Sequence, residues 1–146
     1  MSGSNVILLI EDNADDAELT LRAFRSSNLL NEIVVVRDGV EALNYLLGTG
    51  TDAGQEPKAK PELILLDLKL PKVGGLALLR RLRAEERTRR IPVIVLTSSN
   101  EEKDILSSYD LGANSFVRKP VSFAQFIMAA KQLGLCWLVL NQATVD

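Results

Sequence analysis

The sequence predicts an α/β protein in which a doubly wound, five-stranded parallel sheet carries helices on both faces. Five short apolar runs are bounded by polar or turn residues, as is typical of strands buried on both faces. Segments with helical spacing lie between these runs, so strands and helices alternate. The chain has 146 residues, of which 47% are hydrophobic, and this suits one domain with its own core over residues 1–146.

The five expected strands are rich in β-branched residues and leucine, which favour extended backbone. In chain order they are 5–10, 32–36, 62–66, 91–96 and 115–117. Helical spacing marks the segments between and after them. The residues that carry this spacing are Ala17, Leu21 and Phe24; Val40, Leu43 and Leu47; Leu76, Leu79 and Leu82; Ile105, Tyr109 and Leu111; and Phe126, Ile127 and Ala130.

Three capping patterns predict where helices begin, because each pairs a side-chain acceptor with an acid or amide three positions later. They are Asp38 with Glu41, Ser99 with Glu102 and Ser122 with Gln125. The stretch 48–61, "GTGTDAGQEPKAKP", is long, polar and rich in Gly and Pro. We expect it to be a surface insertion before the third strand.

The composition excludes several classes of function. The net charge is −2, so neither nucleic acid nor a membrane surface is expected as a partner. The basic run 80–90 is interrupted by acids and lacks aromatic residues, which indicates a solvated helix face. The chain has no histidine, so no imidazole chemistry can come from it. One cysteine and a start without a leader pattern favour the cytoplasm.

Reactive side chains follow the expected strands. Glu11 and Asp12 follow the first strand, Asp67 ends the third, Thr97 ends the fourth and Lys119 follows the fifth. In open parallel sheets such groups gather beyond the carboxyl ends of the strands. Three carboxylates in one cleft repel each other unless a cation lies among them, and oxygen ligands of this kind suit Mg²⁺. A carboxylate beside Mg²⁺, a hydroxyl and a lysine are what forming an aspartyl phosphate requires.

These residues also occur in motifs that resemble the receiver domain of two-component response regulators across essentially the whole chain. The motifs are "EDN" (11–13), "DLKLPKVGG" (67–75), "LTS" (96–98) and "FVRKP" (116–120). The resemblance implies a flavodoxin-like three-layer sandwich with strand order 2-1-3-4-5, in which the first and third strands are neighbours. The ordered set at successive strand ends is much more specific than any one motif.

The resemblance also implies a role for each site residue. Asp67 would be the phosphoacceptor, Asp12 a direct Mg²⁺ ligand, Glu11 a ligand through water, the backbone carbonyl of Lys69 a further ligand, Thr97 the switch hydroxyl, Phe116 the switch aromatic and Lys119 the phosphoryl partner. A cis peptide bond is expected between Lys119 and Pro120. Family members often have Asn where this chain has Lys69, and a lysine there is expected to crowd or reposition the attacking water and so to alter the lifetime of the phosphoryl group.

Longer phrases such as "ILLIEDNADDAELT" and "SYDLGANSFVRKPV" are similar to the small, output-less regulators that serve phytochrome histidine kinases. That likeness implies a histidine kinase partner, self-catalysed phosphotransfer rather than enzymatic turnover, and a homodimer formed through the fourth helix, fifth strand and fifth helix. The aromatic tail at about 134–146 fits this habit, with Trp137 and Leu138 as expected interface residues.

Three alternatives remain beside this interpretation. A Mg²⁺-dependent phosphatase or phosphotransferase could also pass through an aspartyl phosphate, but it generally has a second acid where this chain has Lys69. A flavodoxin-type nucleotide or flavin module needs a phosphate loop after the first strand, whereas the stretch 11–16, "EDNADD", would repel anions. A receiver used only as a scaffold is poorly motivated because no key group is missing.

Overall fold

The structure is a computed structural model that describes residues 6–25, 31–48, 60–70, 74–97, 107, 109–119 and 122–132. Its strands are β1 (Val6–Ile10), β2 (Glu32–Val36), β3 (Leu63–Asp67), β4 (Val93–Thr97) and β5 (Ser115–Arg118). Its helices are α1 (Ala14–Arg25), α2 (Gly39–Leu47), α3 (Gly75–Ala84) and α5 (Phe123–Gln132). In the described part of the chain, no helix combines the length and apolar character needed to cross a bilayer.

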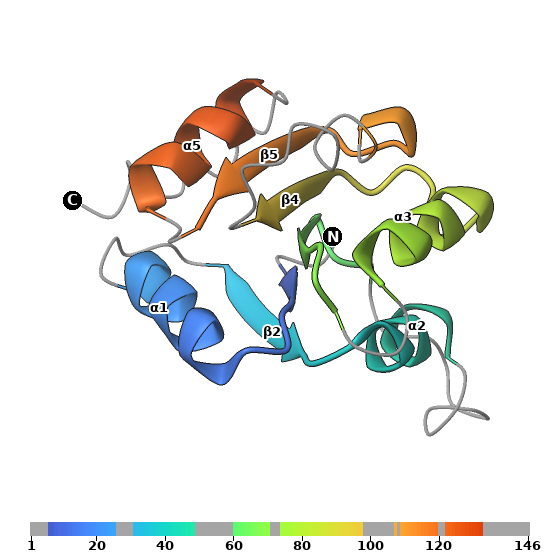
Figure 1. Cartoon of the computed structure of the whole chain (residues 1–146), viewed down its shortest axis with the longest axis horizontal. Coiled ribbons are helices and arrows are strands. Elements are labelled where there is room, and N and C mark those ends of the chain that lie inside the picture. The colour runs from blue at the N-terminus through green and yellow to red at the C-terminus, as the bar shows by residue number, and fades with distance from the viewer. Residues whose placement is uncertain are drawn as a thin grey trace.

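The five strands form one parallel sheet in the order β2-β1-β3-β4-β5 (Figure 1), which confirms the predicted fold. The connection from β2 to β3 crosses over β1, so β1 and β3 lie side by side with Ile10 opposite Leu66. On the other side of β3, Asp67 is opposite Leu96 of β4. This register places the carboxyl ends of β1, β3 and β4 next to one another at a single edge of the sheet.

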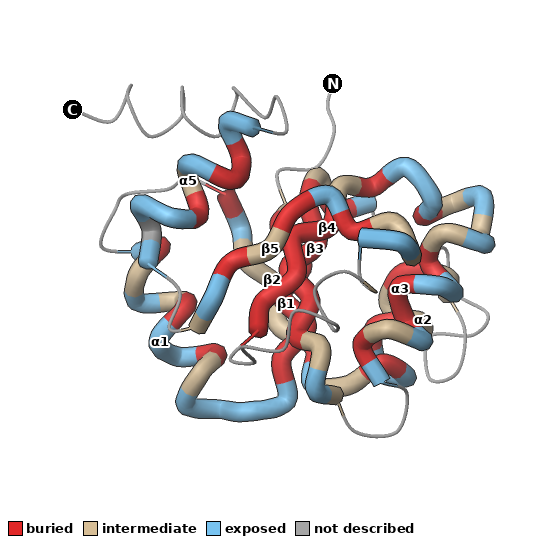
Figure 2. Tube along the Cα trace, turned by 45° about the horizontal axis from the view of Figure 1, so that its top comes forward, coloured by how far each residue is buried: buried red, intermediate tan, exposed pale blue. Residues whose placement is uncertain are grey.

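Alternate residues of each central strand pack into two separate cores, because successive side chains of a strand point to opposite faces. On one face, Ile7 and Leu65 pack with Phe24 of α1 and Phe126 of α5, whose ring centroids are 4.6 Å apart. On the other face, the strands pack against α2 and α3. Figures 1 and 2 show these two helix layers on either side of a sheet whose centre is buried.

Two of the predicted helix starts are confirmed by capping hydrogen bonds. The backbone N–H of Glu41 donates to Oδ1 of Asp38 over 2.8 Å, and that of Gln125 donates to Oγ of Ser122 over 3.2 Å. The third predicted cap, at Ser99, lies outside the described residues, as do most of the expected insertion at 48–61 and the tail at 134–146.

The buried face of α2 is shifted from the one that the sequence indicated. Its buried residues are Gly39, Ala42 and Leu46, and Val40 is exposed. The apolar spacing of Val40, Leu43 and Leu47 therefore identified the helix correctly but placed the centre of its contact face one residue too far along the chain.

Arg83 is an exception to the expected solvated face of 80–90. Its guanidinium donates to the carbonyl oxygens of Gly112, over 2.8 and 3.0 Å, and of Ile91, over 2.8 Å. It also donates to Oδ1 of Asn114 over 3.0 Å. Burial lowers the pKa of this arginine. Arg83 thus ties the end of α3 to the chain just before β4 and β5.

The turn that follows the site requires glycine at position 75. The backbone N–H of Gly75 donates to the carbonyl of Leu68 over 3.1 Å, and a Cβ here would lie 2.5 Å from the Leu68 Cα. Since the obstructing atoms are backbone, they cannot move aside without shifting Asp67 and Leu68. We expect Gly75→Ala to lower the free energy of unfolding by about 2–3 kcal/mol, measured by urea denaturation.

The adjacent Gly74 is a matched control for this substitution. Its φ is −64°, and a Cβ there would meet no atom within 4 Å. Gly74→Ala is therefore expected to change the unfolding free energy by no more than about 0.5 kcal/mol. Equal effects of the two variants would contradict the packing argument for Gly75.

Candidate functional site

The side chains at the carboxyl edge of the sheet come from four neighbouring strands. Glu11 directly follows β1, Asp67 is the last residue of β3, Thr97 ends β4 and Lys119 directly follows β5. The backbone N–H of Glu11 donates to the backbone carbonyl of Val36 over 3.0 Å, and that of Lys119 donates to the backbone carbonyl of Thr97 over 2.9 Å. Because both residues continue the sheet's hydrogen bonding, their backbone positions are fixed relative to Asp67.

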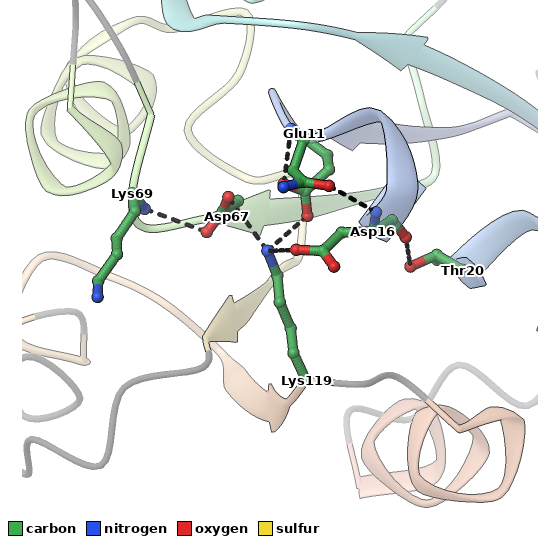
Figure 3. A network of polar contacts seen from close by, with 7 residues as sticks. Glu11, Asp16, Thr20, Asp67, Lys69 and Lys119 are labelled. Carbon is green, nitrogen blue, oxygen red and sulfur yellow. Dashed lines mark hydrogen bonds and ion pairs between the residues drawn. The ribbon is translucent and has the colours of Figure 1, made fainter. Parts of the chain in front are cut away.

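The centre of the site is the ammonium group of Lys119. Its Nζ lies 2.7 Å from Oε1 of Glu11, 3.0 Å from Oδ2 of Asp16 and 3.2 Å from Oδ2 of Asp67. Figure 3 shows the three carboxylates arranged around this nitrogen. The remaining oxygen of Glu11, Oε2, accepts the backbone N–H of Asn13 over 3.2 Å. One cation therefore holds together acids from three different segments of the chain.

Negative charge exceeds positive charge at this site. Glu11, Asp12, Asp16 and Asp67 supply four carboxylates against the single ammonium of Lys119, which gives a net charge of −3 when all are ionised. The side chain of Glu11 is 0% exposed. Its pKa is raised to about 7, first by burial and then by the neighbouring Asp67, although Lys119 opposes the shift. Such a site favours an added cation.

Lys119 remains charged in spite of its burial. Its side chain is only 11% exposed, and burial alone would lower the pKa of a lysine. The contacts with Glu11 and Asp16, together with the charge of Asp67, outweigh burial and raise the pKa of Lys119 above its ordinary value. The ammonium is consequently a permanent cation at the carboxyl edge over the physiological pH range.

Three of the acids could hold a metal ion. Glu11, Asp12 and Asp67 each offer a carboxylate oxygen, and these oxygens lie within 4.8 Å of one another. Asp12 is exposed, so it can be reached from solvent, and Oδ1 of Asp67 is oriented by the backbone N–H of Lys69 over 3.1 Å. A donor set made only of oxygens fits hard divalent cations such as Mg²⁺, Mn²⁺ or Ca²⁺.

Of the remaining predicted residues, the structure describes Thr97, Phe116 and Lys69. Thr97 is 1% exposed and lies on the strand next to Asp67. Phe116 is half-buried on β5 and makes an edge-to-face contact with Tyr109, with 6.2 Å between ring centroids. The side chain of Lys69 is exposed and extends away from the carboxylates (Figure 3). Three predicted residues lie outside the described residues, namely Pro120, Trp137 and Leu138.

The sequence reasoning missed Asp16. This residue lies in the first turn of α1, where its backbone N–H donates to Oδ1 of Asn13 over 2.9 Å and its carbonyl accepts the hydroxyl of Thr20 over 2.9 Å. A signal was present in the sequence: Asp16 follows Asn13 by three residues, the spacing at which Asn13 can cap the start of a helix through the Asp16 N–H. A helix that begins there brings Asp16 back toward the strand ends.

A doubly wound sheet that gathers acids and a lysine at its carboxyl edge is the arrangement of receiver domains. The family described as the response regulator receiver domain matches residues 7–131, and the chain belongs to this family. It is similar to the solved bacteriophytochrome response regulator AtBRR, with 51% identity and a TM-score of 0.81 over 91% of this chain and 94% of that one.

Two cyanobacterial relatives are also similar over nearly the full length. Response regulator Rcp1 of Synechocystis sp. (strain PCC 6803) is 35% identical over 91% of this chain and 88% of its own length. Its Mn²⁺-bound crystal structure has a TM-score of 0.73 over 91% of this chain and 94% of that one. The phosphorylated cyanobacterial phytochrome response regulator RcpA is 39% identical, with a TM-score of 0.74 over 94% and 95% of the two chains.

Proposed function

We propose that this chain is a phosphorylation-driven switch in which Asp67 accepts a phosphoryl group from the phosphohistidine of a histidine kinase. The observation that carries the proposal is the placement of the Asp67 carboxylate. It belongs both to the group of oxygens that fits a divalent cation and to the set of acids around Lys119, with Oδ2 3.2 Å from Nζ. The phosphorylated state of the relative RcpA supports the same chemistry.

In the transfer step, a carboxylate oxygen of Asp67 attacks phosphorus and forms the new O–P bond. The P–N bond to the kinase histidine breaks, and the imidazole nitrogen keeps its electron pair. Bound Mg²⁺ would supply positive charge that offsets repulsion between the phosphoryl oxygens and the acids. Lys119 pairs with a phosphoryl oxygen once the acyl phosphate has formed, since an ammonium and a phosphoryl oxygen make a charge-assisted hydrogen bond.

The metal proposed for this site is Mg²⁺, held by Asp12 directly, by Glu11 through water, by Asp67 and by the backbone carbonyl of Lys69. Oxygen donors with few direct carboxylates suit Mg²⁺, which keeps several waters and shares its shell with phosphate. The Mn²⁺ bound in the relative Rcp1 supports a divalent ion in this family. The excess of three negative charges around Lys119 supports it from this chain's own residues.

The response to phosphorylation is proposed to pass from Thr97 to Phe116. The buried Thr97 hydroxyl moves toward the phosphoryl group, and the half-buried Phe116 ring moves into the space it leaves. This reshapes the face formed by the fourth helix, β5 and α5. The chain then acts as a cytoplasmic signalling protein with self-catalysed phosphotransfer, not as an enzyme that turns over external phosphate esters.

The proposed partners are a phytochrome-type histidine kinase and a second copy of the chain. The likeness to the bacteriophytochrome regulator AtBRR supports the kinase assignment. Phosphotransfer profiling against the histidine kinases of the same genome should show preferential transfer from the phytochrome kinase. Sedimentation before and after phosphorylation measures the oligomeric state, and a monomer in both states would contradict the proposed homodimer.

The proposed phosphorylation is tested by incubating the chain with acetyl phosphate and Mg²⁺ and locating the acyl phosphate by mass spectrometry. We expect one phosphoryl group on Asp67, and none when the divalent cation is chelated. Labelling of another residue, or labelling that does not need the cation, would contradict the proposal. A chain that instead hydrolyses small phosphomonoesters at enzyme-like rates would indicate the phosphatase alternative.

Cation binding is expected to weaken below neutral pH because of Glu11. Its pKa in the metal-free protein is raised from 4.5 to about 7, so the carboxyl group holds a proton at pH 6 that must leave when Mg²⁺ binds. Isothermal titration with Mg²⁺ should therefore give an affinity about tenfold lower at pH 6 than at pH 8.

The same shift makes the metal-free protein less stable as pH rises. A raised carboxyl pKa contributes stability that is present below pH 4.5 and is lost as the pH rises through about 7. Saturating Mg²⁺ should accordingly raise the melting temperature more at pH 8 than at pH 6.

Glu11→Gln is the control for the pH dependence of Mg²⁺ binding, because without the titrating group the affinity for Mg²⁺ should differ little between pH 6 and pH 8. Equal affinities in the unsubstituted chain would contradict the argument.

A further inference from the structure

The ammonium of Lys119 is surrounded by three carboxylates, with which it forms ion pairs. A lysine ammonium carries three N–H groups. Three carboxylate oxygens lie within reach of its Nζ: Oε1 of Glu11 at 2.7 Å, Oδ2 of Asp16 at 3.0 Å and Oδ2 of Asp67 at 3.2 Å (Figure 3). A phosphoryl oxygen that pairs with Lys119 must therefore take the place of one of these acceptors.

The three acceptors differ in how easily they can be displaced. The Glu11 side chain is 0% exposed, so removing its cation would leave a buried, unpaired carboxylate. Asp67 is the residue that carries the phosphoryl group and stays beside Lys119. The Asp16 side chain is 39% exposed in the first turn of α1, so water can solvate its carboxylate when it leaves the ammonium. Of the three acceptors, Asp16 is therefore the one whose displacement from the ammonium costs the least free energy, because water hydrates its carboxylate.

We propose that Asp16 occupies Lys119 as an internal competitor of the phosphoryl group and is displaced from the ammonium when Asp67 is phosphorylated. The inference rests on the proposed function, since it describes uptake at Asp67. Two physical effects of Asp16 both oppose the binding of a phosphoryl group. Asp16 takes one Lys119 donor that the phosphoryl oxygen needs, and its negative charge repels the incoming anion. Asp16 thereby weakens the affinity of the site for phosphoryl groups.

Replacing Asp16 with Asn tests the inference, because the amide keeps the shape of the side chain and removes its charge. Two probes are used with Mg²⁺: acetyl phosphate, followed by the extent of Asp67 labelling, and beryllofluoride, followed by ¹⁹F NMR. We expect the half-saturating concentration of both probes to fall on the order of fivefold. The maximal extent of labelling should stay the same, because the acceptor Asp67 is unchanged.

Asp15→Asn is the matched control. Asp15 is exposed and lies in the same first turn of α1, so both variants remove one negative charge from nearly the same position. Only Asp16 is 3.0 Å from the ammonium. A gain in affinity is also a change that structural damage would not produce. Thermal unfolding verifies that Asp16→Asn is folded, and Asp16→Ser serves as a second charge-removing variant if it is not.

The outcomes separate this inference from the proposed function. If the unsubstituted chain is labelled on Asp67 while Asp16→Asn and Asp15→Asn bind both probes equally, only the competition is overturned. Weaker binding by Asp16→Asn overturns it as well, since that result would make Asp16 a residue that holds Lys119 ready for the phosphoryl group. A chain that takes up neither probe overturns the competition and the proposed function together.

Discussion

Asp67→Asn is expected to abolish phosphoryl uptake from acetyl phosphate while leaving the fold intact. The amide that replaces the carboxylate is a poor nucleophile, and no other acid is expected to substitute for it at the end of β3. The hydrogen bond from the Lys69 N–H to Oδ1, 3.1 Å in the unsubstituted chain, can still form with an amide oxygen. Labelling with acetyl phosphate and Mg²⁺ measures the loss.

The same substitution should also weaken the binding of Mg²⁺. Asp67 is one of the three acids whose oxygens lie within 4.8 Å of one another, and it raises the pKa of Glu11 by hydrogen bonding and by its charge. Removing Asp67 makes proton release from Glu11 easier, but it leaves two carboxylates instead of three for the cation, and the loss of a ligand dominates. We expect the affinity for Mg²⁺ to fall by at least about tenfold, measured by isothermal titration.

Asp15→Asn is again the control, because it removes an exposed carboxylate from the nearby first turn of α1 without touching the acid cluster. It should keep full labelling. Stoichiometric labelling of Asp67→Asn at Asp12 or Asp16 would show that the acids are interchangeable. The geometry around Lys119 would then not determine which acid accepts the phosphoryl group, and the proposal that Asp67 is the phosphoacceptor would be wrong.

The position of the site could be predicted from the sequence because parallel sheets impose it. Acids and a lysine after successive apolar runs must gather at one edge, whatever the details of the helices. The neighbouring placement of β1 and β3 could not be predicted in this way, since alternation of strands and helices is compatible with several strand orders. That part of the prediction came from the resemblance to receiver domains, and the pairing of Ile10 with Leu66 confirms it.

The two residues that sequence reasoning misjudged depend on tertiary position rather than on residue type. Asp16 is one of five acids in the stretch 11–18, and only the start of α1 at Ala14 decides which of the helical acids faces Lys119. Arg83 is one of several arginines in 80–90, and only its contacts with the distant Gly112 and Asn114 distinguish it from exposed members such as Arg81. Charged runs predict a solvated surface well on average, but they do not reveal which member is half-buried and hydrogen-bonded to distant residues.

Lys119→Met is expected to destabilise the metal-free protein by about 3 kcal/mol at pH 8, because it removes the cation from the fully buried Glu11 carboxylate. The loss should be much smaller at pH 5. Lys119 lowers the pKa of Glu11, so in the variant this pKa rises above its present value of about 7. At pH 5 the carboxyl group is then protonated and no longer needs a cation.

Urea denaturation at the two pH values, in the presence of a chelator, measures this effect. Lys131→Met is the matched control, since Lys131 is exposed on α5 and its loss should change the unfolding free energy little at either pH. A loss that is the same at pH 5 and pH 8 would mean that Lys119 stabilises the chain by packing alone. Saturating Mg²⁺ should restore part of the lost stability at pH 8, because a divalent ion among Glu11, Asp12 and Asp67 supplies the positive charge that the variant lacks. The lysine and a bound divalent ion would thus each offset part of the same excess of negative charge, and the phosphoryl group proposed for Asp67 would pair with both.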